Sequence, residues 1–219
     1  MVKRGNAAWS SEYDPLFVSL WSEAMKFSIS EITDLIRHRR SIPPKGHTDR
    51  LVQKEMVERI LINATWAPTH GLTQPWRFTV YTGAGREGLS RFIGEEYTRI
   101  TPPEKFTQRK LEDLTQRPLQ SSVVIGIGME RDPHGRIGER DELLAVACAV
   151  QNMYLTCAAY GLGGFWSTAG VLTGDGMRRH LGLSEQGQAL GLFYIGYPAG
   201  EWPKGHRRPL ETVCQWVDA

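Results

Sequence analysis

The stretch APTHGLTQPWRFTVYT, residues 67–82, joins an amphipathic helix to an alternating strand. Pro68 and Pro75 restrict its backbone at both ends. Hydrogen-bonding and aromatic side chains stand between the prolines and at the first position of the strand: Thr69, His70, Thr73, Gln74 and Trp76. Such a segment is either a well-formed turn or a rigid polar edge that faces a flat ligand, and the rest of the chain has to distinguish the two.

Two helices are predicted before this stretch. In SISE, Ser28 and Glu31 have the spacing of a capping box, and the helix that they begin ends in RHRRS at residues 37–41. IPPKGHTD is a loop, and Thr48 or Asp49 is predicted to cap the second helix. The apolar spacing predicts these buried residues for it: Val52, Met56, Ile60 and Leu61.

Helices are predicted around residues 86–98 and 103–116. SSVVIGIGM, residues 121–129, is a continuous apolar run that is typical of a central strand. Residues 143–159 are apolar on nearly every side, so we expect a helix that is buried all round. Gly161 has the place of its C-terminal cap.

A short helix and a last strand are predicted toward the C-terminus. TGDGMRRHLG suits a helix with Thr173 as its N-cap, and ALGLFYIGYP suits a strand. Helices outnumber strands, which predicts an α+β or layered α/β fold with few strands. We expect residues 28–219 to form one domain, preceded by an extension at residues 1–27.

Length and composition exclude several classes. The 219 residues are enough for one sizeable domain, and a net charge of +2 is too weak to indicate a nucleic-acid binder. Cys148, Cys157 and Cys214 form no CxxC pair, so we expect a reducing cytoplasm, no disulfide and no cysteine-based metal site. The N-terminus lacks the apolar core of a signal peptide, and LLAVACAV is too short to span a bilayer.

The common catalytic motifs are missing from the sequence. It contains no GxxxxGK[ST], no HExxH and no GxSxG. GIGMER lacks the third glycine of the dinucleotide fingerprint, and GLGGF follows a helix and not a strand. We therefore expect no P-loop, no Rossmann cofactor site, no metal centre and no nucleophilic triad.

Two candidate ligand-binding segments are basic. Arg39, Arg40 and Ser41 offer guanidinium forks and a hydroxyl that suit a phosphate, although basic residues also complement the dipole at a helix C-terminus. KGHRRP, with Arg207 and Arg208, is a second basic cluster, or simply a solvated loop.

Two further segments suit a planar ligand. His70 and Gln74 offer donors and acceptors to the rim of a heteroaromatic ring, or they belong to a turn that precedes a core tryptophan. In YGLGGFWSTAG the glycines allow close backbone approach, and Trp166, Ser167 and Thr168 supply an aromatic face, amides and hydroxyls. The alternative is a glycine-rich helix cap that leads into a strand.

In their order and spacing, these four segments resemble the FMN-dependent nitroreductase family. The resemblance covers roughly residues 29–212, from RRS through AP…QPW and SSVVIGI to QNMYLTCAAYGLGGFWSTAG, FYIGYP and RRPLE. It implies an α+β nitroreductase-like fold, a three-layer α/β/α arrangement with a central, mainly antiparallel sheet. It also implies an obligate homodimer with two FMN sites at the subunit interface.

The resemblance assigns roles residue by residue. Arg39, Arg40 and Ser41 match the phosphate and ribityl motif, and Arg207, or Arg208 as the alternative, matches the basic residue that closes over the phosphate. The other assigned residues edge the flavin ring, His70 from the other subunit in one arrangement: His70, Gln74, Trp166, Ser167 and Thr168. The proline-bounded loop would then be a rigid edge against the ring.

The implied activity is a ping-pong oxidoreductase that transfers hydride from NADH or NADPH through flavin N5 to nitroaromatics, quinones or similar acceptors. Pro43 stands where larger family members often have a lysine near the flavin N1–C2 edge, and Leu72 stands where many members have an asparagine, so contacts to the pyrimidine end of the flavin are expected to differ. The alternatives are a specialised flavoenzyme of the superfamily (dehalogenating, azoline-oxidising or flavin-destroying) and a flavin storage or sensing protein. No nucleic-acid or membrane partner is expected.

Overall fold

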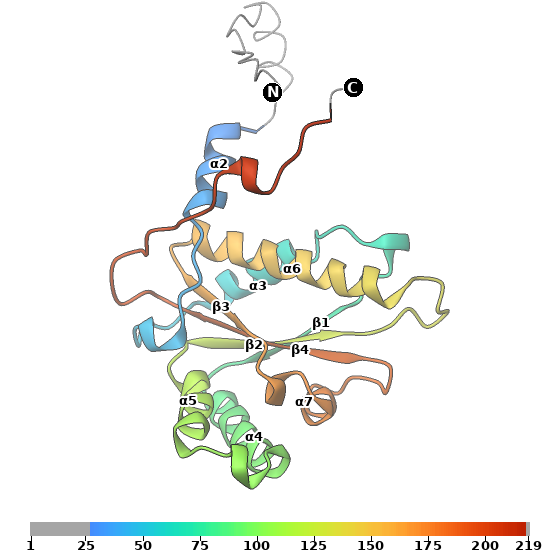
Figure 1. The fold of residues 1–219 in the computed structure, drawn as a ribbon. Helices are drawn as coiled ribbons and strands as arrows, with labels where there is room; N and C mark the ends of the chain where they lie inside the picture. The colour runs from blue at the N-terminus through green and yellow to red at the C-terminus, as the bar shows by residue number, and fades with distance from the viewer. Residues whose placement is uncertain (1–26, 218–219) are drawn as a thin grey trace, which may run out of the picture.

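The computed structural model describes residues 27–217, so the predicted extension lies outside the described residues except for Phe27. Its centre is a four-stranded sheet of order β1-β2-β4-β3, in which all neighbours are antiparallel (Figure 1). The strands are β1 (Trp76–Tyr81), β2 (Val123–Met129), β3 (Gly163–Ser167) and β4 (Gln188–Gly196). Every residue of β2 is buried, which confirms the predicted central strand.

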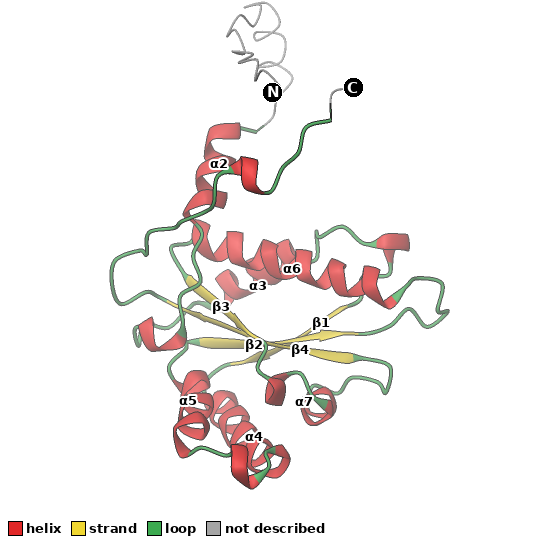
Figure 2. Ribbon diagram, viewed as in Figure 1, coloured by secondary structure: helices red, strands yellow, loops and turns green. Residues whose placement is uncertain are grey.

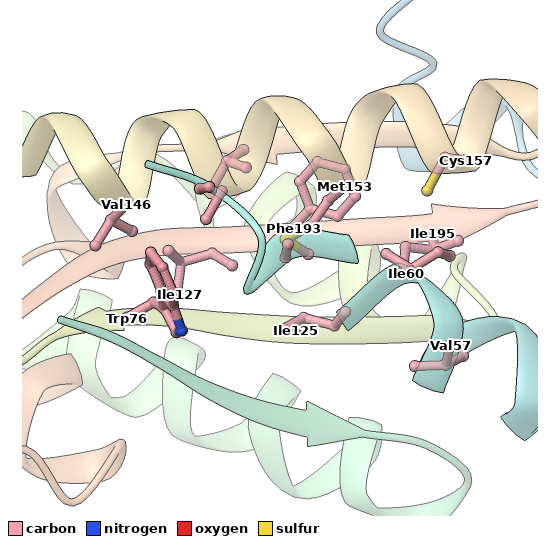
Figure 3. Packing of buried hydrophobic residues seen from close by; sticks show 14 of the residues in the cluster. Val57, Ile60, Trp76, Ile125, Ile127, Val146, Met153, Cys157, Phe193 and Ile195 are labelled. Atoms are coloured by element: carbon pink, nitrogen blue, oxygen red, sulfur yellow. The ribbon is translucent and has the colours of Figure 1, made fainter. Parts of the chain in front are cut away.

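One face of the sheet is covered by α3 (Lys54–Ala64) and α6 (Glu139–Ala159). Their apolar residues meet those of alternate strand positions, because successive side chains of a strand point to opposite faces. Figure 3 shows this core between α6 and the sheet. It includes Ile60, Ile125, Val146, Met153 and Phe193.

The opposite face is covered by α4 (Ala84–Ile100), α5 (Gln108–Leu119) and α7 (Asp175–His180) (Figure 2). Val124, Leu192 and Tyr194 point into this second cluster. Gly126 and Gly128 are glycines because Leu181 and Leu183 pack on them: an added Cβ would lie 2.4 Å and 2.9 Å from those side chains. The GIG of β2 therefore serves helix packing.

The remaining elements of the described chain are α2 (Ile29–His38) and short 3₁₀ turns. Ser28 caps α2 by accepting a hydrogen bond from the Glu31 amide, as predicted. The 3₁₀ turns are η1 (Pro44–Gly46), η2 (His70–Leu72), η3 (Pro103–Lys105), η4 (Gly170–Leu172) and η5 (Leu210–Thr212).

Two predicted helix caps were wrong. Gln53, and not Thr48 or Asp49, stands at the N-cap position of α3, without a side-chain capping hydrogen bond. The Val52 amide donates to Ser122 Oγ at 2.7 Å, which holds the preceding residues extended beside the start of β2. Gly174 stands at the N-cap position of α7. Thr173 is instead engaged in the preceding turn, where its hydroxyl donates to the Gly170 carbonyl at 3.4 Å.

The prediction that α6 is buried all round was also wrong for the described chain. One face packs on the sheet, but Leu144 on the other is 53% exposed. By length and composition alone the whole helix would suffice to cross a membrane, contrary to the expectation from its shorter apolar run. Its buried face lies on the sheet, which is the position of a core helix.

Candidate functional site

A basic groove lies between the end of α2 and the segment of residues 198–209, which we call the strap. The two run side by side in Figure 1. The groove has a volume of about 670 Å³. None of the described residues that line it is acidic; they are Ile36, Arg37, Arg39, Arg40, Gln151, Gly205, His206 and Arg207. Two basic clusters far apart in the sequence thus face one space that suits an anion.

Arg39 is held at this groove by Tyr154 of α6. Its guanidinium carbon lies 5.1 Å from the centre of the Tyr154 ring, within the range of a cation–π contact. The Tyr154 hydroxyl accepts a hydrogen bond from Ser41 Oγ at 3.3 Å and another from the Trp166 amide at 2.8 Å. The Ile42 amide donates to the Gly164 carbonyl at 2.9 Å. Tyr154 therefore ties the RRS segment to β3.

The other arginines of the two basic clusters differ in their surroundings. Arg40 gives its hydrogen bonds to backbone carbonyls, including that of Pro203 at 2.7 Å. Arg207 and Arg208 are both exposed, but Arg207 lines the groove and Arg208 does not. Of the two alternatives for the C-terminal basic residue, the geometry therefore favours Arg207.

The predicted flavin-edge residues of β3 point in different directions. The Trp166 indole packs against the α6-side core and donates to the Leu190 carbonyl at 2.9 Å. Ser167 is buried, and its hydroxyl accepts from Arg117 of α5 at 3.2 Å. Thr168 is exposed. In the described chain, a ligand at the sheet edge would therefore meet β3 itself and not the Trp166 indole.

The proline-bounded loop is strained and braced. Leu72 and Gln74 have φ values of 55° and 45°, which side-chain-bearing residues adopt at a cost of about 1–3 kcal/mol each. His70 Nδ1 lies 2.7 Å from Asp141 Oδ2 in the first turn of α6. The Thr73 hydroxyl is buried without a hydrogen-bond partner in the described structure. Such strain and an unpaired polar atom are typical of ligand-binding loops.

This loop contacts the first turn of α6, whereas the basic groove lies beside the C-terminal half of the helix. The loop contacts Asp141, and the groove contacts Gln151 and lies beside Tyr154. Ten to thirteen residues at 1.5 Å each separate them by about 15–20 Å along the helix. Within one chain His70 and Gln74 are therefore not brought together with Arg39 and Arg207.

His47 fastens the RRS segment to the end of β4. Its ring atoms lie 3.1 Å from the Ile42 carbonyl and 3.2 Å from Ser121 Oγ. A carbonyl only accepts, so Nε2 carries the proton and Nδ1 accepts from Ser121. Burial lowers the pKa of His47 to about 4. The hydrogen bond to the Ile42 carbonyl raises this pKa, but its effect is smaller than that of burial. Burial of the ring in the folded chain therefore favours its neutral form.

Replacing His47 by glutamine is expected to reduce the loss of folding stability that occurs when the pH is lowered. The unfolded chain protonates this histidine near pH 6.5 and the folded chain near 4, so the free energy of unfolding falls as the pH drops between these values. From pH 7 to pH 5 this accounts for about 2 kcal/mol. Urea unfolding at the two pH values measures it.

The control for this prediction is His134→Gln, at an exposed histidine. This variant should lose as much stability as the original protein on acidification. Burial also lowers the pKa of His180, which adds to the loss in every variant alike. An identical loss in His47→Gln and the unmodified chain would show that His47 does not titrate in this way.

Three residues of this region were not predicted as part of it: His47, Tyr154 and Trp202. Tyr154 stands inside an apolar helix, and Trp202 and His47 stand in loops, where no spacing marks them.

Pro43 lines a second groove of about 590 Å³ together with Lys45, Arg117 and Phe165.

Comparison with known proteins gives a family. Residues 36–197 match the model described as the nitroreductase family. Over 144 residues, 66% of this chain and 76% of the relative, the chain is 25% identical to YdjA of Escherichia coli K12, provisionally named an NAD(P)H nitroreductase.

Solved structures of similar proteins have a similar fold. A nitroreductase-like family protein from Bacillus cereus superposes with a TM-score of 0.72 at 28% identity, covering 89% of this chain and all of that one. A provisionally named nitroreductase from Desulfovibrio desulfuricans, solved in complex with FMN, gives a TM-score of 0.62 at 24% identity, with 86% and 97% covered. At 24% identity, the comparison with the second structure shows a similar fold and no more.

Proposed function

Because the chain belongs to the nitroreductase family, we propose that it is an FMN-dependent oxidoreductase that passes hydride from NAD(P)H to nitroaromatics, quinones or similar electrophiles. The observation that carries the proposal is the basic groove, where arginines from both ends of the domain meet and none of the described lining residues is acidic. A phosphate monoester carries a charge of about −1.5 to −2 at neutral pH, which this groove can balance.

The residues present suit FMN better than a dinucleotide cofactor. Arg39 and Arg207 converge on one space that suits one phosphate. Ser41 and the edge of β3 continue from it, as the ribityl chain and ring would require. The unpaired Thr73 hydroxyl and the strained loop around Gln74 offer a second, rigid surface.

When bound, FMN would supply the two-electron hydride-transfer chemistry. The protein contributes binding and orientation. Arg39 and Arg207 hold the phosphate, and Tyr154 keeps Ser41 and β3 in register. His70 and Gln74 present donors to the rim of the ring. No side chain is assigned as a general acid, since protons are available from water.

The distance between loop and groove argues for a homodimer. One protomer keeps His70 and Gln74 about 15–20 Å from its own groove, so in our proposal these side chains complete the partner's site. Exposed apolar residues offer the contact surface. They lie on the outer face of α6, on the proline-bounded loop and in the tail: Leu72, Leu143, Leu144, Leu210, Val213, Trp216 and Val217. The three-layer domain would then act as a cytoplasmic dimer.

Deleting residues 210–219 is expected to weaken both the dimer and FMN binding. The tail exposes 78% of Trp216 and 76% of Val213, a surface that a partner protomer would bury at about 25 cal/mol per Å². Size-exclusion chromatography with light scattering, over a range of protein concentrations, measures the dimer, and fluorescence titration measures FMN.

Glu211→Gln is the matched control, because it changes a charge in the same segment and leaves the apolar residues in place. It should dimerise as the original chain does. A deletion variant that keeps its dimer and its FMN affinity would refute the role of the tail.

Mass spectrometry of the cofactor released from the purified protein tests the proposed function. We expect FMN. Finding FAD, or no flavin after incubation with FMN, would reject it. Steady oxidation of NADH or NADPH with a nitroaromatic or quinone then separates an enzyme from a flavin storage protein.

A further inference from the structure

Arg40 differs from Arg207 in the number of backbone carbonyls that it binds: Arg40 donates to three of them, and Arg207 donates to the carbonyl of the adjacent His206. Arg40 Nη1 donates to the Arg37 carbonyl at 2.6 Å and to the Arg39 carbonyl at 2.7 Å. Its Nε donates to the Pro203 carbonyl at 2.7 Å, across 163 residues of sequence. One guanidinium thus joins the C-terminal end of α2 to the strap.

The strap is shaped to receive this guanidinium. Gly205 lies against it so closely that an added Cβ would be 2.2 Å from Arg40 Nη2. Trp202 stacks on His38 with ring centres 5.6 Å apart and planes 6° apart, and its Nε1 donates to the His38 carbonyl at 2.5 Å. Just before Arg207, the strap therefore contacts the end of α2 through Trp202 and contacts Arg40 through Pro203 and Gly205.

We propose that Arg40 is a positioning residue, which latches the strap to α2 and thereby holds Arg207 at the groove, and that it is not itself a phosphate ligand. The planar fork of arginine serves several carbonyls at fixed angles, which a lysine ammonium on a flexible stem does not do. The effect on FMN rests on the function proposed above, whereas the latch itself does not.

Limited trypsin digestion of the full-length protein, with and without added FMN, tests the latch directly. Trypsin cuts after Lys204 and Arg207, and cleavage in a native chain follows local opening. Arg40→Ala and Arg40→Lys should both be cut at these sites several-fold faster than the original chain. Cleavage after Lys54 in α3 should be unchanged, as the internal control. Equal rates at the strap in all three proteins would overturn the latch.

A double-mutant cycle on FMN affinity tests what the latch does. Arg40→Ala should weaken FMN binding by about as much as Arg207→Ala, roughly ten- to hundredfold. Arg40→Lys should resemble Arg40→Ala. Gly205→Ala should also weaken binding by displacing the guanidinium, and should add little once Arg40 is alanine. Lys204→Ala, in the same strap but outside the groove, should bind as the original chain does.

A direct phosphate contact predicts a different pattern. Arg40→Lys would then keep most of the affinity, and the losses from Arg40→Ala and Arg207→Ala would add, which would overturn the positioning role. If the original chain binds no FMN at all, the proposed function fails, while the digestion still decides whether Arg40 holds the strap.

Discussion

Replacing Arg39 or Arg207 by alanine is expected to weaken FMN binding by about ten- to hundredfold and to leave riboflavin binding unchanged. Each change removes a charge-assisted hydrogen bond to the phosphate, on the order of 1.5–3 kcal/mol. Riboflavin has no phosphate, so it reports only on the ring and ribityl contacts. Fluorescence titration of each variant with both flavins measures the two affinities.

The matched control is Arg208→Ala. Arg208 lies next to Arg207 but does not line the groove, so its loss should affect neither flavin. If Arg39 and Arg207 only complement a helix end and a solvated surface, their loss costs less than about 1 kcal/mol of stability and does not discriminate between the flavins. Equal weakening of both flavins, or a selective loss in Arg208→Ala alone, would contradict the assignment.

Replacing Gly191 by alanine is expected to destabilise the fold by about 3 kcal/mol or more. Gly191 lies at a bulge of β4: the pairs Gly126↔Leu192 and Gly128↔Ala189 leave two residues of β4 opposite one of β2. Its φ is 107°, and an added Cβ would lie 2.2 Å from the Ser167 carbonyl oxygen. Neither backbone segment can yield without disturbing the sheet.

Two glycines separate the causes of this loss. Gly83 has a φ of 49° but no atom within 4 Å of an added Cβ, and Gly200 has neither constraint. Gly83→Ala should cost about 1 kcal/mol through strain alone, and Gly200→Ala should stay within about 0.5 kcal/mol. Chemical denaturation ranks the three variants. A Gly191→Ala protein as stable as Gly200→Ala would show that the bulge adapts to the side chain.

Much of the fold could be predicted from local patterns. The apolar run of β2, the alternation of β1 and the Ser28 cap all follow from short-range chemistry, and the structure has each of them. The start of α3 could not be predicted, because a hydrogen bond from Val52 to Ser122, 70 residues away, holds the helix entry extended. The exposed face of α6 likewise depends on which surface meets the sheet, and composition does not encode this.

The candidate site was harder to predict from the sequence than the fold was. Arg39 and Arg207 became a pair through the family resemblance, since no spacing rule links segments so far apart. The sequence gives no sign that Arg40 contacts Pro203 or that Gly205 receives its guanidinium. Adjacent arginines look equivalent in a sequence, and their different roles arise only when the strap is in place.

Anaerobic addition of NADH or NADPH to the FMN-loaded protein tests whether the protein is an NAD(P)H-dependent oxidoreductase. We expect at least one of the two donors to bleach the visible absorption of the bound flavin, and we expect the absorption to return when a nitroaromatic or quinone is added. A flavin that remains oxidised with both donors, while free of other ligands and bound at full occupancy, would contradict an NAD(P)H-dependent oxidoreductase.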